Sequence, residues 1–468
     1  MSGHVAAVDV GTSAVRAAIV RADGRTIAHA RVERTSSVGG ELYDPDALVA
    51  EVNAALRAVA DAPAPDAVVV SAHIGAVVVD ADARPIVPGG GWADRRGLDA
   101  LLAAPDALRA RIRAASGRPQ LTGGALALLL SLTGDERRRA RAVLSPKDHL
   151  VAALTDELAT DTIDAAYTLA SDGATGRWCE DVIAELGLDP GLFPPQLAPT
   201  ATVGGLTAAA AAATGLPAGT PVLSGGPDGS VGIALLLGTS SEAVADVAGT
   251  TDVVGRLLPG DRGTADVGAG VVLNPSALPG RVVAGGATGL TGGAVAHWRG
   301  LVGAVADDVL DAVPPGADGL RVLPAMTGER FPRWRSDAAG GLAGQRPSHG
   351  PAHLLRAAQE AAAFTVREGI DVLDPGGELP VVFAGGSARS EAVARLRADV
   401  WGRPVRVAGD PDVTLRGAAA LGLVGVGLLA DLDEARRRLL GEDRVVMPDP
   451  ARTRRYRDVY EEWRALRR

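Results

Sequence analysis

The sequence predicts an α/β protein with two related lobes, and three observations carry that prediction. Short apolar segments alternate with helical segments along most of the chain, which is typical of α/β folds. A strand, a turn of small residues and a returning strand open the chain at 4–22, and the same pattern returns at 242–258. The 468 residues leave room for two or three domains. We therefore expect two similar lobes that meet near residues 238–241.

Three antiparallel strands open the predicted N-terminal lobe. His4–Val10 is a short apolar run suited to a buried strand, and Ala14–Ala22 returns after a tight turn. The hairpin signal Asp23-Gly24 leads into a third strand, Thr26–Glu33. The rest of this lobe is expected to contain a helix over 45–62 capped by Asp44, a strand over 67–79, helices over 98–116 and 126–142, and a helix entered through 145–148.

The pattern restarts near the middle of the chain. An alanine helix over 208–214, a strand over 220–224, a glycine-rich turn and a helix over 230–237 come first. Strands over 242–247 and 252–258 then mirror the first hairpin, and an apolar strand over 381–384 runs into a helix over 391–401. We divide the chain into an N-terminal lobe 1–238, a C-terminal lobe 239–430 and a charged helical extension 431–468 whose basic runs are expected to be solvated.

Composition excludes several classes of protein. The net charge of −9 disfavours a general nucleic-acid coat. Cys179 is the only cysteine, so an intramolecular disulfide is excluded. The N-terminus has no basic segment followed by an apolar core, and the apolar run 417–430 is shorter than the ~18 residues of a spanning helix. A soluble, cytoplasmic protein is expected.

Asp9 ends the first predicted strand, beside the turn Gly11-Thr12-Ser13 and close to Arg16. A carboxylate oxygen there suits Mg²⁺, which prefers hard oxygen ligands. Glycine lets backbone N–H groups approach phosphate oxygens, the two hydroxyl groups add donors, and Arg16 can neutralise phosphate charge. The alternative is an ordinary turn whose polar side chains satisfy local backbone groups.

A second carboxylate, Asp228, lies on the glycine-rich turn between a predicted strand and a predicted helix. Phosphoryl transfer to an alcohol needs a base that takes the hydroxyl proton as the P–O bond forms. Asp228 is placed for that role near the expected cleft, and it could also touch the metal through water. The alternative is that Asp228 only caps the following helix, as aspartate often does.

Two turns of the second lobe add to this chemistry. Gly249-Thr250-Thr251 mirrors the first turn and offers phosphate donors from the opposite side of the cleft. Gly385 and Gly386 follow an apolar strand and would let a flat adenine approach the backbone, although an ordinary strand-to-helix turn has the same composition.

Other nucleotide-binding and metal-dependent classes are excluded by missing motifs. The sequence contains no GxxxxGK[ST], no GxGxxG after the first strand and no HExxH, and Lys147 is its only lysine. A P-loop NTPase and an ordinary protein kinase need a phosphate-binding lysine in a specific context, and a dinucleotide Rossmann site needs the glycine fingerprint. Nothing supports zinc catalysis.

In this order, the segments resemble the FGGY carbohydrate kinases, and the xylulokinase-like members most closely. VAAVDVGTSAVRAAIV resembles the first phosphate motif of the family, LSGGPDGSVG the segment with the catalytic aspartate, VAGTTDVV the second phosphate motif and VFAGGSARSEAVARLRADVWGRPV the adenosine motif. The segments GGGWADRR, LSPKDHLVAALTDELATDTIDAAYT and LPAMTGERFPRW also fit. The resemblance covers about residues 4–427 and implies two ribonuclease-H-like lobes, as in actin, Hsp70 and sugar kinases, around a central cleft that binds ATP.

The resemblance also implies a role for each motif residue. Asp228 would be the general base, and Asp9 a ligand of Mg²⁺, with Asp228 also near the metal. The phosphate groups of ATP would be bound by Gly11, Thr12, Ser13 and Arg16 from one lobe and by Gly249, Thr250 and Thr251 from the other, and the adenosine by Gly385, Gly386 and Ser390. Lys147, in a Pro-Lys-Asp segment, is expected to be structural.

Departures from the family pattern concern the sugar site. Where xylulokinases have Gln-Met-His-Gly, this chain has Ala72-His73-Ile74-Gly75, which displaces the imidazole by one position and to the other face of a strand. The amide that usually follows the catalytic aspartate is replaced by Gly229. We expect the sugar pocket to be lined by His73, Trp92, Asp94, Arg95 and Asp228, with a structural histidine and a core tryptophan as the alternatives for the first two.

The sequence thus predicts an ATP- and Mg²⁺-dependent kinase whose first-choice substrate is a ketopentose such as xylulose. The alternative substrate is a sugar acid or polyol of the gluconate, glycerol or erythritol type. Two other classes stay open: a non-catalytic sugar or nucleotide sensor on the same fold, and an actin- or Hsp70-like assembly protein. The predicted partners are ATP and the sugar, with neither nucleic acid nor membrane, and the protein is expected to be a monomer or a homodimer.

Overall fold

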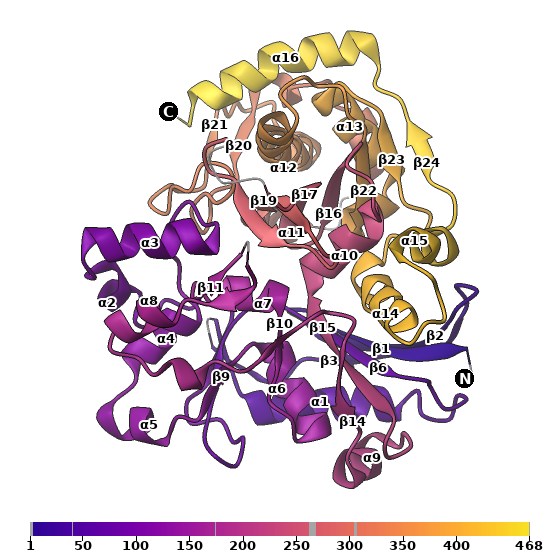
Figure 1. Ribbon diagram of the computed structural model, residues 1–468. Coiled ribbons are helices and arrows are strands. Elements are labelled where there is room, and N and C mark those ends of the chain that lie inside the picture. Colours follow the sequence, from indigo (N-terminus) through magenta and orange to yellow (C-terminus); the bar gives the residue numbers. More distant parts are fainter. Residues whose placement is uncertain (1–2, 40, 174, 262–267, 304–306, 468) are drawn as a thin grey trace.

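The computed structural model describes residues 3–39, 41–173, 175–261, 268–303 and 307–467, which form two lobes, each built on one mixed β-sheet (Figure 1). The first sheet has six strands in the order β14-β15-β6-β1-β2-β3, and the second has seven in the order β18-β19-β17-β16-β22-β23-β24. In both sheets a central strand pairs antiparallel with the strand that follows it in sequence, and parallel with a later strand on its other side. The predicted α/β fold with two similarly arranged lobes is confirmed.

The strands of both sheets are short; β1, β6 and β16 at the centres are buried along their whole length, whereas the edge strands β3 and β24 are largely exposed. In the first sheet the strands are β1 (His4–Val10), β2 (Ala14–Arg21), β3 (Thr26–Glu33), β6 (Val68–Ala72), β14 (Thr202–Gly205) and β15 (Pro221–Pro227). In the second sheet they are β16 (Val244–Ala248), β17 (Asp252–Pro259), β18 (Val272–Pro275), β19 (Arg281–Ala287), β22 (Val381–Gly385), β23 (Val405–Val407) and β24 (Arg444–Val446).

Helices and small strands surround the two sheets. The helices are α1 (Pro45–Arg57), α2 (Leu98–Leu102), α3 (Asp106–Ser116), α4 (Ala125–Ser131), α5 (Gly134–Arg139), α6 (Pro146–Thr155), α7 (Thr162–Tyr167), α8 (Glu180–Glu185), α9 (Ala208–Thr214), α10 (Asp228–Leu237), α11 (Thr291–Val302), α12 (Pro351–Leu373), α13 (Glu391–Trp401), α14 (Val413–Gly425), α15 (Leu432–Leu440) and α16 (Pro450–Ala465). The small strands are β4 (Ser37–Gly39), β5 (Leu42–Tyr43), β7 (Val77–Val79), β8 (Gly89–Gly90), β9 (Ala142–Leu144), β10 (Thr160–Asp161), β11 (Ser171–Asp172), β12 (Arg177–Trp178), β13 (Gln196–Leu197), β20 (Arg321–Leu323) and β21 (Gly341–Ala343).

Two helices, α10 and α14, pack between the lobes. α10 directly follows β15 of the first sheet but packs on β16 and β17 of the second, whereas α14 comes from the C-terminal half and packs on β1 and β6. The helices also contact each other, and a Cβ on Gly417 would lie 2.5 Å from the carbonyl oxygen of Val231, so glycine permits the close crossing. Because β15 leads straight into α10, Asp228 lies at the junction of the two lobes.

Three predicted elements are interrupted in the structure. The helix expected over 98–116 is two helices, α2 and α3, separated at Pro105, which precedes the first residue of α3. The helix expected over 126–142 divides into α4 and α5, because Thr133 caps α5 in a reciprocal arrangement with Glu136. The strand expected over 67–79 divides into β6 and β7 around His73–Gly75.

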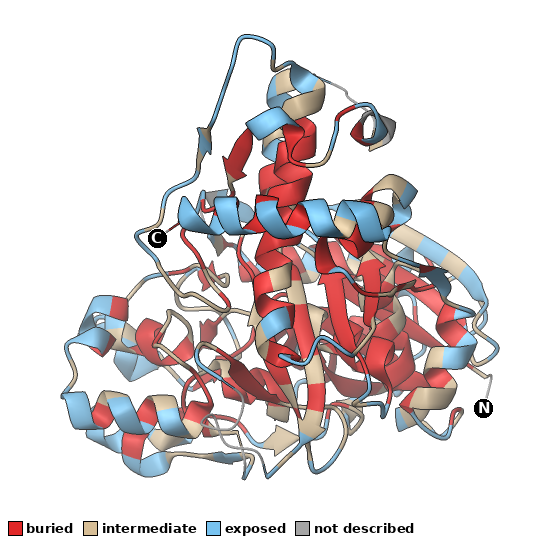
Figure 2. Cartoon of the chain, turned by 90° about the horizontal axis from the view of Figure 1, so that it is seen from above, coloured by how far each residue is buried: buried red, intermediate tan, exposed pale blue. Residues whose placement is uncertain are grey.

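The segment after residue 430 is only partly a solvated surface. β24 pairs with β23, and α16 buries Tyr456, Val459, Tyr460 and Trp463 against the C-terminal lobe. These residues recur at helical spacing among exposed arginines, so one face packs on the core while the other meets solvent. Figure 2 shows this division along the helix that ends at the C-terminus. Among the described residues, none of the helices has both the length and the apolar character that crossing a membrane requires.

Candidate active site

A cavity of about 550 Å³ lies between the lobes and is lined by both predicted carboxylates, Asp9 and Asp228. Residues of all three predicted turns also line it: Gly11, Thr12 and Ser13 from the first lobe, and Gly249, Thr250, Thr251, Gly385 and Gly386 from the second. Arg16, His73 and Trp92 complete the set of predicted residues found there. Segments more than 200 residues apart in the sequence therefore meet in one cavity.

Asp9 presents one free carboxylate oxygen in this cavity. The residue is the last but one of β1 and is 1% exposed. Its Oδ2 accepts hydrogen bonds from Arg16 and from Thr414 Oγ1, the latter at 3.1 Å, whereas Oδ1 is buried with no partner among the described residues. Burial raises the pKa of Asp9, and the positive charge of Arg16 opposes that rise. An unpartnered carboxylate oxygen is a suitable ligand for a hard cation or its bound water.

Arg16 is held by carboxylates in this structure. It pairs with Asp9 across the β1–β2 hairpin, and its Nη1 donates to Asp412 Oδ1 at 2.7 Å. Its Nη2 also donates to Thr414 Oγ1 at 3.0 Å. The guanidinium group thus links the first hairpin to the start of α14 and orients Asp9. Sequence reasoning missed Asp412 and Thr414, although a polar run ahead of an apolar helix was an available signal.

Asp228 is the first residue of α10, and its side chain does not cap the helix. The N-cap position belongs to Pro227, and Asp228 Oδ1 accepts a hydrogen bond from the N–H of Gly229 at 2.6 Å. Burial raises the pKa of Asp228 to about 7, and the negative charge of Asp9 adds to the rise, whereas the Gly229 N–H and Arg16 oppose it. Both carboxylates line the same cavity, and the charge of Asp9 acts on Asp228.

His73 faces the cavity from the end of β6. It is 7% exposed, its Nδ1 lies 3.2 Å from the carbonyl oxygen of Ile74, and its ring meets that of Tyr43 edge to face, 5.5 Å between centroids. Its Nε2 is buried and has no partner in the described part of the chain. Burial lowers the pKa of His73 to about 4, so the imidazole is neutral at pH 7. A neutral imidazole with one free nitrogen suits a hydroxyl group.

Three predicted site residues lie outside this cavity. Asp94 is buried, accepts hydrogen bonds from Arg96 and packs against Gly90, so it supports the loop that carries Trp92. Arg95 is exposed and does not line the cavity. Ser390 caps α13 by accepting from the N–H of Val393 at 3.3 Å, and it lines a second hollow that shares Gly386 with the main cavity.

Sequence reasoning also missed a group of aromatic and polar residues at the cavity wall. Their members are Arg118, Tyr167, Asn274, Arg330 and Trp334. Tyr167, Arg330 and Trp334 belong to segments that carried the family resemblance but had no assigned role. Arg118 and Asn274 come from a helix end and an edge strand, where no motif marked them.

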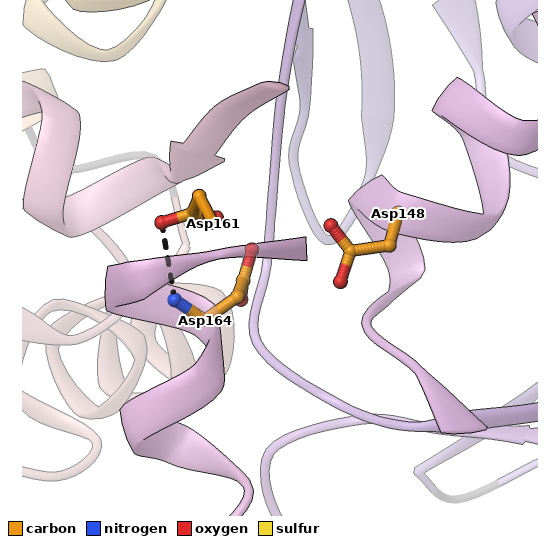
Figure 3. A group of neighbouring side chains, drawn as sticks. All are labelled: Asp148, Asp161 and Asp164. Atoms are coloured by element: carbon orange, nitrogen blue, oxygen red, sulfur yellow. Dashed lines mark hydrogen bonds between the residues drawn. The ribbon is translucent and has the colours of Figure 1, made fainter. Parts of the chain in front are cut away.

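Asp148 on α6, Asp161 on β10 and Asp164 on α7 form a buried acidic cluster (Figure 3). Their carboxylate oxygens lie within 4.8 Å of one another, a spacing that a metal ion could use. The ammonium group of Lys147, however, is paired with Asp148, with Asp161 at 3.2 Å and with Asp164 at 3.6 Å. Lys147 also donates to the carbonyl oxygen of Ser224 at 2.8 Å, so the cluster anchors β15 just before Asp228.

Known proteins match the chain along both lobes. The model of the N-terminal domain of the FGGY family of carbohydrate kinases matches residues 4–234, and that of the C-terminal domain matches residues 244–426. A xylulose kinase from Lactococcus lactis subsp. lactis is 26% identical over 405 residues, which cover 83% of this chain and 80% of the relative. An autoinducer-2 kinase from Escherichia coli is 28% identical over 356 residues, covering 71% and 66% respectively.

The solved structures support the same fold. A gluconate kinase from Lactobacillus acidophilus superposes with a TM-score of 0.86 at 21% identity, covering 99% of this chain and 97% of that one. The likeness extends over both lobes and the helices between them. At this identity it establishes the fold alone.

Proposed function

Because the chain belongs to the FGGY family of carbohydrate kinases, we propose that it transfers the γ-phosphoryl group of ATP to a hydroxyl group of a small sugar or sugar derivative, with Asp228 as the general base. The observation that carries this proposal is the single cavity that Asp9 and Asp228 share with small-residue turns from both lobes. Two carboxylates and two sets of phosphate donors are the groups that phosphoryl transfer to an alcohol requires.

The residues present fit ATP and a divalent metal, which kinases of this family generally use. The turns Gly11–Ser13 and Gly249–Thr251 line the cavity, as do Gly385 and Gly386. A Cβ on Gly385 would lie 2.3 Å from the carbonyl oxygen of Ala248, so the neighbouring backbone requires glycine at this position. Asp9 Oδ1, unpartnered among the described residues, would hold Mg²⁺ directly or through water. The metal would neutralise charge on the phosphate oxygens.

Asp228 would act on the acceptor. Its carboxylate takes the proton of the attacking hydroxyl group as the new O–P bond forms and the bond from phosphorus to the bridging oxygen of ADP breaks. Since its pKa is raised to about 7, the base is strong enough to accept the proton and is still largely ionised slightly above neutrality. Gly229 follows Asp228, so the hydrogen bonds that select the sugar must come from other walls of the pocket.

The acceptor is a small polyhydroxylated molecule. The names of the relatives make xylulose the first neutral compound to assay, and His73 and Trp92 offer a hydrogen-bonding nitrogen and an aromatic face in the cavity. Two arginine side chains in the cavity wall, Arg118 and Arg330, favour the sugar-acid alternative.

A coupled assay of ADP release over ketopentoses, alditols and aldonates tests the proposal. We expect at least one acceptor to raise ATP consumption well above the rate in its absence, and phosphorylated acceptor to form in equal amount. In the same assay, Asp61→Asn is the matched control for Asp228→Asn, because it removes the charge of an exposed carboxylate away from the cavity. Binding of ATP and sugars without ADP release would instead establish a non-catalytic sensor.

A further inference from the structure

Two arginine side chains in the cavity wall form no ion pair with the residues that the structure describes. Arg118 is 7% exposed, and its Cζ lies 4.4 Å from the centroid of the Tyr167 ring. The Cζ of Arg330 lies 4.8 Å from the ring centroid of Trp92 and 5.7 Å from that of Trp334. Within the described ranges, neither guanidinium group forms an ion pair or a hydrogen bond, and Nη2 of Arg118 is buried without any partner.

Other buried arginines of this chain are paired. Arg397 donates to Asp246 at 2.5 Å and to Asp252 at 2.7 Å, and Arg356 pairs with Glu360 at 2.9 Å. Removing a charge from water without a partner is costly, which is why buried charges are almost always compensated. Arg118 and Arg330 differ from these paired arginines, and both line the cavity.

Both guanidinium groups line one cavity, and the charge of Arg330 acts on Arg118. Burial lowers the pKa of Arg118 to about 10; Tyr167 opposes this shift and Arg330 reinforces it. Burial also lowers the pKa of Arg330, against the effects of Tyr167 and Glu41. Glu41 is exposed and, in the described structure, forms no ion pair with Arg330. An anion bound between the arginines would compensate both charges.

The backbone fixes Arg118 in this position. Gly117 ends α3 with a φ of +65°, and its carbonyl oxygen accepts a hydrogen bond from the N–H of Leu273 in β18 at 3.1 Å. The N–H of Arg118 donates to the carbonyl oxygen of Arg113, also at 3.1 Å. Arg118 is thus held where a helix of the N-terminal half meets a strand of the C-terminal sheet.

The neighbouring groups suit a hydroxylated chain. Tyr167 Oη accepts a hydrogen bond from Asn274 Nδ2 at 3.2 Å, whereas Asn274 Oδ1 is buried and unpartnered in the described structure. That amide oxygen can accept from a hydroxyl group, and the rings of Trp92 and Trp334 border the same cavity. A carboxylate is planar and accepts two N–H donors from a guanidinium group. Neither arginine belongs to a phosphate-facing turn.

We infer that Arg118 and Arg330 bind a carboxylate group of the phosphoryl acceptor, so that the preferred substrate is a sugar acid: a polyhydroxylated chain with a carboxylate at one end. This inference rests on the proposed function and names its substrate class. It favours the sugar-acid alternative over the ketopentose that the sequence suggested first.

Acceptor pairs that differ in one group test the inference. Xylonate is compared with xylitol and gluconate with glucitol, with xylulose and xylose 5-phosphate as additional acceptors, by ADP release in the wild-type protein. Hydrogen bonds to charged groups contribute enough to expect kcat/KM of one aldonate to exceed that of its alditol and of xylulose by about tenfold or more.

Arginine variants then locate the effect. Arg118→Met and Arg330→Met are each expected to raise KM for the aldonate by about 10- to 100-fold, while KM for ATP changes by less than about threefold and KM for the alditol rises much less than KM for the aldonate. Arg118→Lys keeps the positive charge but lacks the planar guanidinium group, so its KM for the aldonate should lie between those of the wild type and of Arg118→Met. Arg455→Met, an exposed arginine on α16, is the matched control, and thermal unfolding with and without the aldonate confirms that each variant is folded.

Each other outcome has a definite meaning. If xylulose or an alditol is used at least as well as every aldonate, or if xylose 5-phosphate is preferred, the inference is wrong while the proposed function stands. A rise in KM for ATP with acidic and neutral acceptors alike would assign the arginines to phosphate binding and also overturn the inference. If no acceptor raises ADP release, the proposed function itself fails.

Discussion

Replacing Lys147 by methionine is expected to destabilise the protein, and more at neutral pH than in acid. The variant keeps a long side chain but leaves Asp148, Asp161 and Asp164 facing one another within 4.8 Å. Removing one partner of a buried ion pair costs about 3–5 kcal/mol, and the lost hydrogen bond to Ser224 adds about 1 kcal/mol. We therefore expect the free energy of unfolding to fall by roughly 4–6 kcal/mol near pH 7.5.

The pH dependence follows from the carboxylates. Burial raises the pKa of Asp161 and of Asp164 above the ordinary value, and Lys147 opposes both shifts. Without the lysine these pKa values rise further in the folded state only. A carboxyl group with a higher pKa in the folded state favours folding at low pH, and its contribution is lost as pH rises towards the folded-state pKa. The difference between variant and wild type should therefore shrink near pH 5.

Urea unfolding followed by tryptophan fluorescence near pH 5 and pH 7.5 measures both effects. Arg455→Met removes an exposed positive charge and should change the free energy of unfolding by no more than about 0.5 kcal/mol at either pH. A loss below about 1 kcal/mol for Lys147→Met, or a loss that is the same at both pH values, would refute the argument that the lysine compensates a buried acidic cluster.

Three further predictions concern the site and the packing around it. Activity towards a neutral acceptor should rise with pH through about 7, because the raised pKa of Asp228 leaves the base protonated below that value; a pH–rate profile that is flat from 5 to 8 would contradict this. Gly417→Ala should cost about 1–3 kcal/mol in thermal unfolding, since the new Cβ would meet backbone between α10 and α14, whereas Gly341→Ala, with nothing within 4 Å of the new atom, should be near neutral. Trp463→Ala should lower the free energy of unfolding by about 3–5 kcal/mol, because the ring is fully buried and its Nε1 donates to a carbonyl oxygen. A change close to zero would contradict the conclusion that α16 packs on the core.

The repeated strand–turn–strand pattern was the sequence signal that predicted most of the fold. Buried apolar runs such as His4–Val10 have one stable place, the interior of a sheet, so β1 and β2 agree with their predicted limits to within one residue. Breaks inside helical patterns were missed where a single residue decided them, as at Pro105 and at the Thr133 cap. Helix propensity summed over a window of residues does not detect a break that a single proline or capping residue causes.

The sequence predicted cavity residues correctly where a carboxylate lay next to a glycine-containing turn. Asp9 lies near the end of β1, just before a glycine-containing turn, and Asp228 follows the glycine-rich end of β15; both line one cavity. Arg118 and Asn274 carry no such mark, because their place in the cavity depends on the contact between α3 and β18, which are far apart in the sequence. Arg95 was expected in the pocket because the segment GGGWADRR resembles one of the family, yet its side chain is exposed.

The central claim is that Asp228 accepts the proton of the acceptor hydroxyl group in the cavity it shares with Asp9. Turnover of the best acceptor by Asp228→Asn, measured beside ATP binding and thermal unfolding of the same protein, tests it most directly. The account predicts that kcat falls by at least about 100-fold while ATP affinity and stability are kept. Turnover within a few-fold of the wild type in that variant would contradict it.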